Sequence, residues 1–448
     1  MIIQDILNQI SIPIPNKMQK LLKSIILLLC FACFMATPKA QDINLDVLNY
    51  DLTIEPDIEQ ESIEGELVIC FKLQGKTESI RLDAHKLVID QLKGLNVKSY
   101  RQLDSKLIVQ LKQSHQKEQE ISIRYHGNPK RGLIFNPLLN QAHTVYFTHD
   151  WMPCHFVPGD KSTFSIKLLL PPDKTCIASG ELQEVVEKAD KKLHKWEQNY
   201  ETAPYTYGFA TGSFTEVNEQ YRGIRLNYYS SEQSKKELKK VFKETPNILQ
   251  FFEEKSGIPY IQNAYSQVLI GLNYQEMSGL SVFSTSYPAS VFKDSSEIHL
   301  TAHELAHQWW GNMITCENFG HFWLNEAFAV YMATAFNEHR FGKGKYEADI
   351  ALYKSIYENL LKRRKDKALV FKKWESSRDN RNVIYYKGAY VLHMLREEMG
   401  DEAFWKGIKS YSKSYWGKSV KTEDFKKLME TAAGADLDVF FEEWVYEK

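Results

Sequence analysis

The sequence lacks the features that would assign the chain to a class directly. Lysine and arginine number 56 and aspartate and glutamate 57, so no charge excess favours nucleic acid or an anionic membrane surface as a partner. The chain also has no internal repeat and no low-complexity tract. Apolar residues make up 43% of it, enough for one large core or two moderate ones. We therefore expect a globular protein that binds no nucleic acid and whose function depends on a local site.

Cysteine is scarce. The six cysteines are Cys30 and Cys33 near the N-terminus and, farther along the chain, Cys70, Cys154, Cys176 and Cys316. Their spacing matches no metal or redox motif. One disulfide is conceivable among the last four, but scattered cysteines in a large domain are more often buried small apolar side chains.

Long hydrophobic runs are missing as well. Residues 25–35 are apolar, but these eleven residues fall short of the ~20 needed to cross a bilayer. They follow three lysines within residues 17–23 and precede a stretch that ends at Ala40, a pattern typical of a secretory signal peptide. We therefore predict a signal peptide and N-terminal extension over residues 1–40, cleavage near Ala40, a secreted or periplasmic protein, and no permanent membrane span.

Some properties of the chain stay open at this point. Met18 stands directly before the basic segment, so the start is either Met1 or Met18. A lipid anchor is disfavoured, because the residues before Cys30 and Cys33 fit a lipidation site badly. The sequence does not indicate the oligomeric state.

The chain divides into two parts by its hydrophobic period. In the first part apolar residues recur with period two, as at Leu67, Ile69 and Phe71, which indicates half-buried strands. In the second part they follow helical spacing. We predict an α+β multidomain fold, with an antiparallel β domain of sandwich or saddle form at residues 41–230 and a mainly helical domain at residues 231–448.

Two details of the second part concern its secondary structure. A helical pattern starts near Leu238, and Gly257 stands where a helix would end. Residues 267–271 and 279–283 depart from the helical pattern, because they are typical of two short strands around a loop.

A candidate metal-binding motif lies in the helical part. Residues 303–307 read HELAH, which matches H-E-x-x-H. Residues four apart share one face of a helix, so His303 and His307 can reach one ion, while Glu304 lies beside it and can take a proton from a water that the ion acidifies. The motif alone also fits two polar histidines on a partly buried helix. The apolar Leu305 indicates a helix packed into a core, where two unpaired imidazoles would be costly.

A catalytic zinc takes three protein ligands and leaves one position for water, so a third ligand is needed. Eighteen residues separate Glu326 from His307, enough for one helix to end near Gly311 and a second to return a carboxylate to the ion. Glu326 lies inside an apolar helical stretch at residues 322–336, where a charge needs a partner. Two histidines and a glutamate, with a further glutamate as the base, form a thermolysin-like set.

With these residues in place, the chain resembles the aminopeptidase N and leukotriene hydrolase family of zinc metallopeptidases, the gluzincins. HELAHQWWGN at residues 303–312, followed by LNEAF at residues 324–328, is similar to the family's metal signature almost residue for residue. The likeness covers most of the chain. It implies a thermolysin-like zinc catalytic domain after the β domain, with one zinc ion per chain held by His303, His307 and Glu326.

A second matching segment is YYKGA at residues 385–389. It is similar to the family's Y-x-K-G-A, whose tyrosine hydrogen-bonds the oxyanion in the transition state. Tyr385 stands two residues before Lys387 and is therefore our candidate in preference to Tyr386. A buried donor aimed at a developing oxyanion contributes ~10²–10³ in rate. The resemblance thus implies Tyr385 as a catalytic residue beside Glu304.

The loop NYQEMSGL at residues 273–280 resembles the family's G-x-M-E-N segment. Its glutamate, Glu276, would face the free α-ammonium of the substrate and so select the N-terminal residue. Three positions depart from the family pattern: Asn273, Gln275 and Met277. The glutamine and glutamate that some relatives place before Pro153 have no clear counterpart in residues 144–150, so exopeptidase specificity is less firmly indicated than zinc hydrolysis.

The C-terminus departs from the family as well. Residues 437–444 are similar to the close of the family's catalytic domain, and the large helical domain that usually follows is missing from the sequence. The resemblance therefore implies a short form of the family. A more open cleft that admits longer peptides is the hypothesis that this suggests.

Together the residues and the resemblance predict a zinc metallo-aminopeptidase that acts on peptides with a free N-terminus. Zinc would polarise the scissile carbonyl and a water, Glu304 would carry the proton to the leaving amine, and Tyr385 would steady the oxyanion. Glu276 would set which bond is presented. The alternatives are a metallo-endopeptidase, a relative that opens a lipid epoxide, and a non-catalytic scaffold. The preferred side chain and the physiological substrate stay open.

Overall fold

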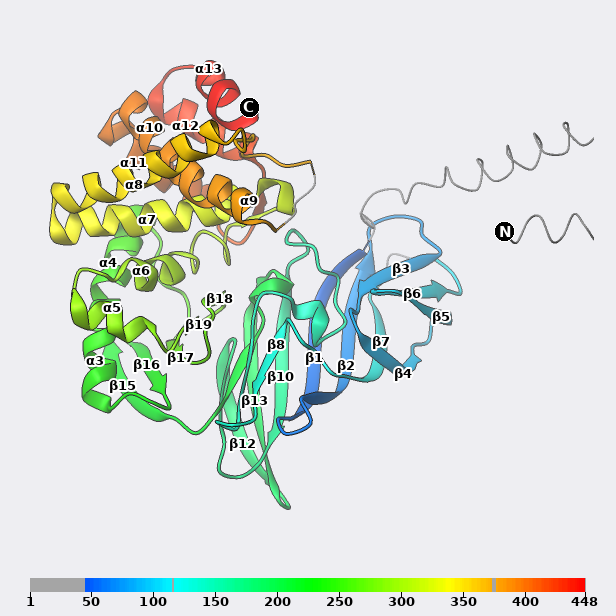
Figure 1. Cartoon of the computed structure of the whole chain (residues 1–448). Coiled ribbons are helices and arrows are strands. Elements are labelled where there is room, and N and C mark those ends of the chain that lie inside the picture. Colours follow the sequence, from blue (N-terminus) through cyan, green and yellow to red (C-terminus); the bar gives the residue numbers. More distant parts are fainter. Residues whose placement is uncertain (1–44, 115–116, 373–375, 448) are drawn as a thin grey trace, which may run out of the picture. The chain divides into compact units, whose positions relative to one another are not determined.

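A computed structural model of the chain describes residues 45–114, 117–372 and 376–447. The predicted signal peptide and its cleavage site lie outside these residues. The first part of the described chain is built of strands and the second mainly of helices, as Figure 1 shows from blue to red along the sequence. The two hydrophobic periods therefore predicted the α+β fold class correctly.

The largest sheet has seven strands in the order β12-β13-β10-β1-β2-β7-β4. All neighbours are antiparallel except β1 and β10, which run parallel. In β2, Leu67, Ile69 and Phe71 are buried while Glu64 and Glu66 are exposed, so the period-two pattern arises because one face meets the core and the other meets solvent. The strands are β1 (Leu45–Asp57), β2 (Ser62–Leu73), β4 (Leu87–Lys93), β7 (Gln119–Gly127), β10 (Ser162–Leu170), β12 (Glu181–Lys188) and β13 (Lys191–Thr202).

Two smaller sheets belong to the same part of the chain. One has the order β3-β6-β5 and the other β11-β14-β9-β8. Their strands are β3 (Ser79–Asp83), β5 (Val97–Leu103), β6 (Lys106–Leu111), β8 (Leu133–Asn136), β9 (Gln141–Thr144), β11 (Thr175–Ala178) and β14 (Phe209–Gly212).

A five-stranded sheet connects the two parts of the sequence. Its order is β15-β16-β17-β19-β18, with the strands β15 (Thr215–Tyr221), β16 (Ile224–Ser230), β17 (Ala264–Leu269), β18 (Gln275–Met277) and β19 (Leu280–Phe283). The predicted pair of short strands is confirmed as β17 and β19, and β18 lies in the loop between them. The sheet takes two strands from before residue 230 and three from after it, so the predicted domain limit at this residue stays a prediction.

The helices make up most of the chain after β16. They are α3 (Lys235–Val241), α4 (Thr245–Ser256), α5 (Tyr287–Lys293), α6 (His299–Ala306), α7 (Trp323–Phe341), α8 (Lys343–Lys362), α9 (Arg378–Asn382), α10 (Gly388–Met399), α11 (Asp401–Tyr415), α12 (Thr422–Ala433) and α13 (Asp438–Phe441). The short strands β20 (Thr315–Cys316) and β21 (Ser419–Val420) pair among them. Gly257 caps α4 with φ 69°, a left-handed conformation that glycine adopts readily, as its position after a helical pattern predicts.

Helix α7 is the central element of the helical part. Residues 323–337 are all buried, and the helix packs against α6, α8 and α10. A helix surrounded in this way is apolar on every side. Glu326 is the one charged residue in this buried stretch, so its carboxylate must find a partner in the interior.

Hydrogen bonds tie the strand-rich part to the segments around α6 and α7. The Tyr205 hydroxyl donates to the Gly311 carbonyl at 2.9 Å and accepts from the Asn325 amide at 2.7 Å. The Lys161 ammonium donates to the Met313 carbonyl at 2.5 Å. The turn after α6 and the first turn of α7 are therefore held from the side of the strands.

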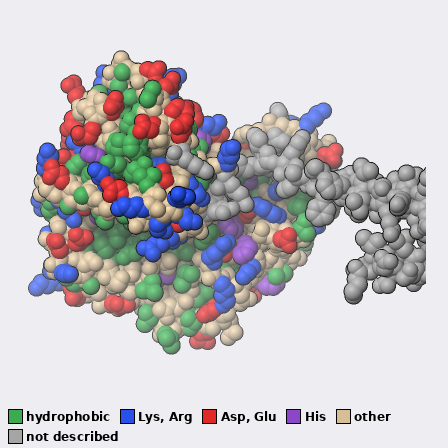
Figure 2. Space-filling model, turned by 45° about the horizontal axis from the view of Figure 1, so that its top comes forward, with side chains coloured by type: hydrophobic (Ala, Val, Ile, Leu, Met, Phe, Trp, Pro, Cys, Tyr) green, Lys and Arg blue, Asp and Glu red, His purple; other side chains and the backbone are tan. Residues whose placement is uncertain are grey.

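The four cysteines of the described residues are free thiols: Cys70 is half-buried and Cys154, Cys176 and Cys316 are buried. Their side chains contribute to packing rather than to a disulfide. Among residues 45–447, leaving out the two internal gaps, no helix combines the length and the apolar character needed to cross a membrane. Figure 2 shows acidic and basic side chains close to one another on the same face, as the balanced composition leads one to expect.

Candidate metal centre

Helix α6 carries both histidines of the HELAH motif. His303 lies within the helix and His307 is its C-cap residue, so the two imidazoles lie one turn apart on the same face. Their Nε2 atoms are 3.2 Å apart and both side chains are buried. Leu305 on the opposite side packs into the apolar core of the helical part. The apolar residues thus orient the helix, and the histidines face inward together.

Glu326 comes to the same point from the first turn of α7. Its Oε2 atom lies 3.7 Å from His303 Nε2 and 3.6 Å from His307 Nε2. Ligand atoms held ~2.1 Å from zinc at tetrahedral corners lie ~3.4 Å from one another. The separations of 3.2, 3.6 and 3.7 Å therefore match the edges of a zinc coordination tetrahedron.

The charge balance at this point also fits a cation. Glu326 Oε2 is buried and has no hydrogen-bond partner, which would be costly without a positive charge beside it. Burial lowers the pKa of His307, but the carboxylates of Glu326, Glu276 and Glu304 outweigh this and raise it to about 9. Burial and the nearby His307 lower the pKa of His303. The donor set therefore attracts one positive charge, and its two imidazoles and one carboxylate suit zinc.

A backbone contact orients one of the ligands. His307 Nδ1 lies 3.1 Å from the Trp310 carbonyl, to which it donates. That bond keeps a proton on Nδ1, so Nε2, which faces Glu326 and His303, is the nitrogen that would bind a metal ion.

Glu304 lies between the two histidines in sequence and is buried with them. Burial raises the pKa of its carboxyl well above the usual value, and the charges of Glu276 and Glu326 act in the same direction while His307 opposes them. A carboxyl with a raised pKa beside a metal site can receive a proton and release it again. Its place next to the donor set is the one that the motif predicts.

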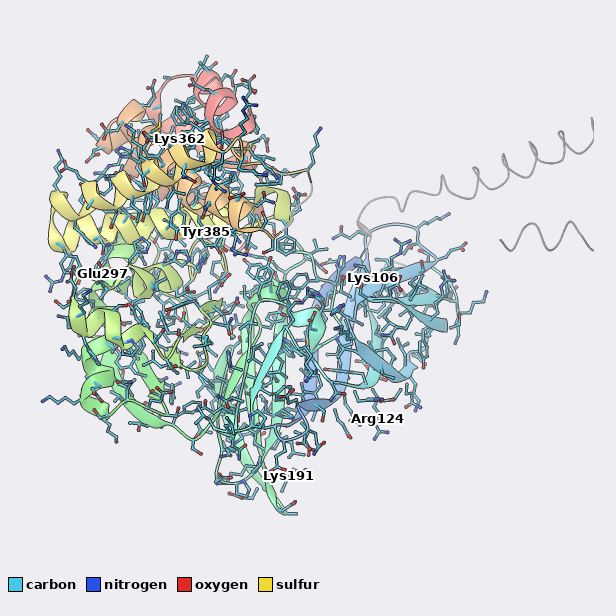
Figure 3. All side chains as sticks on the ribbon, viewed as in Figure 1. Lys106, Arg124, Lys191, Glu297, Lys362 and Tyr385 are labelled. Atoms are coloured by element: carbon cyan, nitrogen blue, oxygen red, sulfur yellow. The ribbon has the colours of Figure 1, made fainter. Side chains whose placement is uncertain are left out.

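Tyr385 reaches the donor set from the C-terminal helices. Figure 3 places it on the face of these helices that is turned towards α6 and β18. Its ring is stacked on His303, with 6.0 Å between ring centroids and an interplanar angle of 20°. Burial raises the pKa of its hydroxyl, and the charges of Glu326 and Glu276 raise it further. The ring of Tyr386 instead packs on Tyr353 at 5.6 Å, so the structure brings Tyr385 and not its neighbour to the site.

Glu276 lies in β18, the short edge strand of the five-stranded sheet. Its side chain is buried and accepts a bond from Gln275 Nε2 at 3.0 Å. The Asn312 amide donates to its carbonyl at 3.3 Å, and the Gln308 amide donates to the carbonyl of Met277 at 3.0 Å. Burial raises the pKa of the Glu276 carboxyl to about 7, and His307 and Glu326 act on it in opposite directions. The turn after α6 therefore holds this carboxylate close to the ligands.

Tyr146 is a residue of the site that the sequence did not reveal. Its hydroxyl is buried without a hydrogen-bond partner, and its backbone N–H donates to Gln275 Oε1 at 2.7 Å. Burial raises the pKa of the hydroxyl, and negative charge on Cys316, Glu276 and Glu326 raises it further. It lies in the segment where the family's polar residues have no counterpart, and no motif marks it. Only the folded chain brings this tyrosine next to the candidate carboxylates.

Another group with metal-like spacing occurs among the described residues, formed by Glu430, Asp436 and Asp438. Asp436 and Asp438 are exposed, and Lys426 is paired with Glu430 at 3.6 Å and with Asp438. Exposed carboxylates with a lysine partner need no metal ion to be stable.

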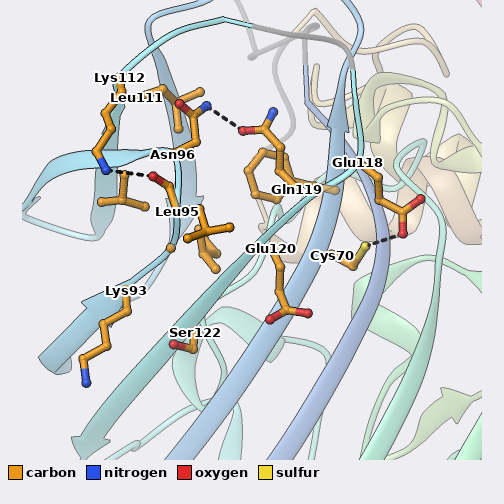
Figure 4. Close-up of a pocket in the computed structure, with 14 residues that line it drawn as sticks. Cys70, Lys93, Leu95, Asn96, Leu111, Lys112, Glu118, Gln119, Glu120 and Ser122 are labelled. Carbon is orange, nitrogen blue, oxygen red and sulfur yellow. Dashed lines mark hydrogen bonds between the residues drawn. The ribbon is translucent and has the colours of Figure 1, made fainter.

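A hollow of about 890 Å³ lies in the strand-rich part, at the turn that joins β4 to β5 (Figure 4). Its wall includes the apolar Phe71 and Leu111 and the charged Glu118. The Cys70 thiol donates to Glu118 at 3.1 Å, and the Asn96 amide donates to Gln119 Oε1 at 2.7 Å, so part of the polar lining is paired within the hollow. None of its lining residues belongs to the metal centre.

Comparisons with known proteins point to one peptidase family. Residues 241–444 match the model of the peptidase family M1 domain, and residues 47–206 match that of the peptidase M1 N-terminal domain. The probable aminopeptidase 1 of Sulfurisphaera tokodaii is 24% identical over 90% of this chain and 53% of its own length. Aminopeptidase M1 of Arabidopsis thaliana is 24% identical over 89% of this chain and 50% of its own length. The chain thus spans about half the length of the curated relatives it matches.

Among solved structures, the M1 zinc metallopeptidase of Deinococcus radiodurans is similar in fold, with a TM-score of 0.77 and 21% identity. The likeness covers 91% of this chain and 96% of that one. A strand-rich part followed by a helical part is therefore an arrangement that occurs in a known protein of similar length.

Proposed function

Because the chain belongs to peptidase family M1, we propose that it is a zinc-dependent aminopeptidase that releases N-terminal residues from peptides. The observation that carries the proposal is the convergence of His303, His307 and Glu326, whose donor atoms lie within 4.8 Å of one another around a carboxylate oxygen without a partner. Catalytic zinc sites use three such ligands and keep a fourth position for water or substrate.

The residues around the donor set supply the remaining functions of peptide hydrolysis. A bound zinc ion supplies a Lewis acid for the scissile carbonyl and makes a water molecule acidic enough to attack at neutral pH. Glu304 receives the proton of the attacking water and passes it to the leaving amine. The Tyr385 hydroxyl, which stays protonated because its pKa is raised, donates to the oxygen of the tetrahedral intermediate.

Glu276 supports the choice of an aminopeptidase over an endopeptidase. It is a buried carboxylate held next to the ligands by the turn after α6. A free α-ammonium would neutralise it, whereas a blocked N-terminus would leave the buried charge with no cation beside it and only its hydrogen bond from Gln275. A peptide with an amine at this point presents its first peptide bond to Glu304 and Tyr385. A solved M1 zinc metallopeptidase from Deinococcus radiodurans, in a variant form, is bound to the peptide Tyr-Ser-Ala, which is a substrate of the proposed kind.

The test compares aminoacyl fluorogenic substrates with their N-acetylated forms. We expect hydrolysis of the free amines, loss of activity with a chelator, and recovery with added zinc. Glu276→Gln should raise KM for the free amines, while Glu430→Gln, in the acidic group remote from the ligands, should leave KM unchanged. A preference for the acetylated substrates would contradict the aminopeptidase assignment, and activity that survives the chelator would remove the metal from it.

We further propose that the mature chain is exported. The support is the order of basic, apolar and small residues between residues 17 and 41. Expression of the full chain in a host with a secretion pathway should yield a processed protein whose N-terminus, read by sequencing, begins near Gln41. An unprocessed chain retained inside the cell would contradict it.

A further inference from the structure

Tyr385 lies in an unusual turn. Residues 383–387 form a π-helical turn between α9 and α10. A π turn contains more residues than an α turn, is rare, and occurs mostly as a single-turn bulge, frequently at functional sites. The additional residue changes the direction of the side chains, so the position of the Tyr385 hydroxyl depends on this turn keeping its geometry. The sequence of the turn, VIYYK, has no glycine or proline that would impose that geometry locally.

Lys387 closes the turn and is tied to another segment. Its ammonium lies 2.9 Å from Asp366 Oδ1 and donates to the Lys367 carbonyl at 2.7 Å. It also lies over the ring of Tyr357, 5.6 Å from the ring centroid. The Lys387 side chain is 2% exposed and that of Asp366 is 9% exposed, so the ion pair is withdrawn from water.

A buried ion pair is a poor stabiliser of a fold. Removing two charges from water costs about as much as their attraction returns, and apolar replacements of such pairs are often neutral. Burial lowers the pKa of Lys387, and the neighbouring Asp366 opposes that effect. The pair is better explained as a geometric constraint, because Lys387 must stay within reach of Asp366 and a shifted turn would break that contact.

The segment that supplies Asp366 is itself held in place. The backbone N–H of Leu369 donates to the Val445 carbonyl at 2.8 Å, and that of Phe371 donates to the Gly320 carbonyl at 2.9 Å. Asp366 therefore belongs to a segment with fixed neighbours on two sides.

The other side of the turn faces the metal centre. Tyr385 is stacked on His303, and Gly388, directly after the turn, lies so close to α7 that a Cβ atom built on it would be 2.6 Å from Ala327 Cβ. Tyr385 and Lys387 are two residues apart and have different neighbours, one at the ligands and one at Asp366. Fixing the position of Lys387 therefore also fixes the backbone of the turn, and with it the position of the Tyr385 side chain.

We propose that the buried pair of Lys387 and Asp366 is a positioning pair, which holds the π turn so that the Tyr385 hydroxyl reaches the oxygen of the reacting carbonyl. The inference rests on the proposed function, since it assigns Lys387 a role that is exerted through Tyr385. Neither member of the pair needs to touch the substrate.

A double-mutant cycle tests this. Lys387→Met and Tyr385→Phe are made singly and together, and Lys387→Arg is made as the conservative variant. We expect Lys387→Met to lower kcat by ~10–100-fold, up to the effect of losing an oxyanion donor, with KM changed less than about threefold. In the Tyr385→Phe background Lys387→Met should cause no further loss, and Lys387→Arg should retain most of the activity. Calorimetry should show weakened binding of a phosphinic peptide, which mimics the tetrahedral state, with the zinc content unchanged.

Arg396→Met is the matched control. Arg396 lies two turns farther along α10 and is bonded to Asp401 at 2.6 Å and to Glu338 at 2.7 Å, with 10% of its side chain exposed. Its loss should reduce thermal stability without lowering kcat. If Lys387→Met does not fold, Asp366→Asn provides the same cycle with a smaller change in volume.

The outcomes distinguish a failure of the positioning role from a failure of the proposed function. A loss from Lys387→Met that is equally large with and without the Tyr385 hydroxyl would overturn the positioning role and leave the proposed peptidase intact, as would an unchanged kcat. Full activity of Tyr385→Phe would overturn the catalytic role of Tyr385, and with it the positioning role of Lys387. A wild-type protein that hydrolyses no aminoacyl substrate would contradict the proposed function itself.

Discussion

Gly388→Ala should damage both the fold and the catalytic turnover, because Gly388 is the point where the turn bearing Tyr385 meets the helix bearing Glu326. A Cβ atom at residue 388 would lie 2.6 Å from Ala327 Cβ, whereas ordinary contacts begin at 3.4 Å. The two backbones must therefore separate by about 0.8 Å, the difference between the two distances. Ala327 is fully buried and directly follows Glu326, so α7 has no free space into which it could move.

The cost follows from the packing of the interior. Adding a methyl group to a well-packed core costs ~1–3 kcal/mol. At ~2–4 °C per kcal/mol for a domain of roughly 200 residues, the melting temperature should fall by several degrees. A misplacement of ~1 Å between catalytic groups can lower turnover ~10²-fold. We therefore expect a clear loss of kcat at an unchanged zinc content.

Gly344→Ala is the matched control, because Gly344 lies in the first turn of α8 with open space where its Cβ would be. That change should stabilise the protein by ~0.5–1 kcal/mol through helix propensity and leave kcat unaltered. The measurements are calorimetric melting, kcat on an aminoacyl substrate and zinc analysis. Equal stability and turnover of the two variants would refute the claim that a close approach of α10 to α7 positions the site.

Four further outcomes are expected. Glu304→Gln should retain zinc and lower kcat by ~10²–10⁴-fold, and unchanged activity at full zinc content would exclude Glu304 as the base. Removing the metal with a chelator should lower the melting temperature as well as the activity, because zinc at 100 times its Kd adds ~2.7 kcal/mol to the free energy of unfolding. An apoprotein with the same melting temperature as the holoprotein would count against the site. Tyr146→Phe removes a buried hydroxyl without a partner, so stability should stay the same or rise, and a loss above ~1 kcal/mol in a denaturant titration would reveal a bond that the structure does not contain. Arg340→Met breaks the bonds to the buried Glu244. Burial raises the pKa of the Glu244 carboxyl, while the bond from Arg340 lowers it, and the net shift of this pKa is downward. The loss should lower the free energy of unfolding by ~1–3 kcal/mol at pH 7, less than for a fully buried pair, because the guanidinium is 45% exposed. A carboxyl whose pKa is lower in the folded state stabilises the protein above its unfolded pKa of ~4.3, and this contribution is lost as the pH falls through the folded-state pKa. The difference in unfolding free energy between wild type and variant should therefore shrink below about pH 4. A difference that is constant with pH would contradict the pairing.

Several features of the site could be predicted because they depend on local spacing. His303 and His307 share a helix face by their separation alone, and Glu304 follows from the same motif. Glu326 was recognisable as a charge in an apolar helix, which needs a partner wherever it is buried. Tyr385 was chosen over Tyr386 by resemblance. Helical periodicity could not have made that choice, because the two lie in a π turn whose side-chain directions differ from those of an α-helix.

Other features were beyond the sequence because they arise from contacts between distant segments. β18 is three residues long and forms because it pairs with β19. A strand this short has no hydrophobic period from which it could be predicted. The five-stranded sheet joins strands from both sides of residue 230, since a change of hydrophobic period marks a change of secondary structure and not a domain limit. Tyr146 is 130 residues from Glu276 along the chain, and its place beside that carboxylate depends on a bond to Gln275.

The sequence by itself determined the classes of secondary structure and the chemistry of the metal ligands, because hydrophobic period and side-chain spacing act over a few residues and are independent of the rest of the chain. Only the tertiary structure decided which carboxylates and hydroxyls gather around those ligands. Their positions depend on the packing of α7 against α6 and α10 and on buried contacts such as that of Lys387 with Asp366. Such contacts join residues far apart in the chain, and their geometry exists only when the whole core has formed.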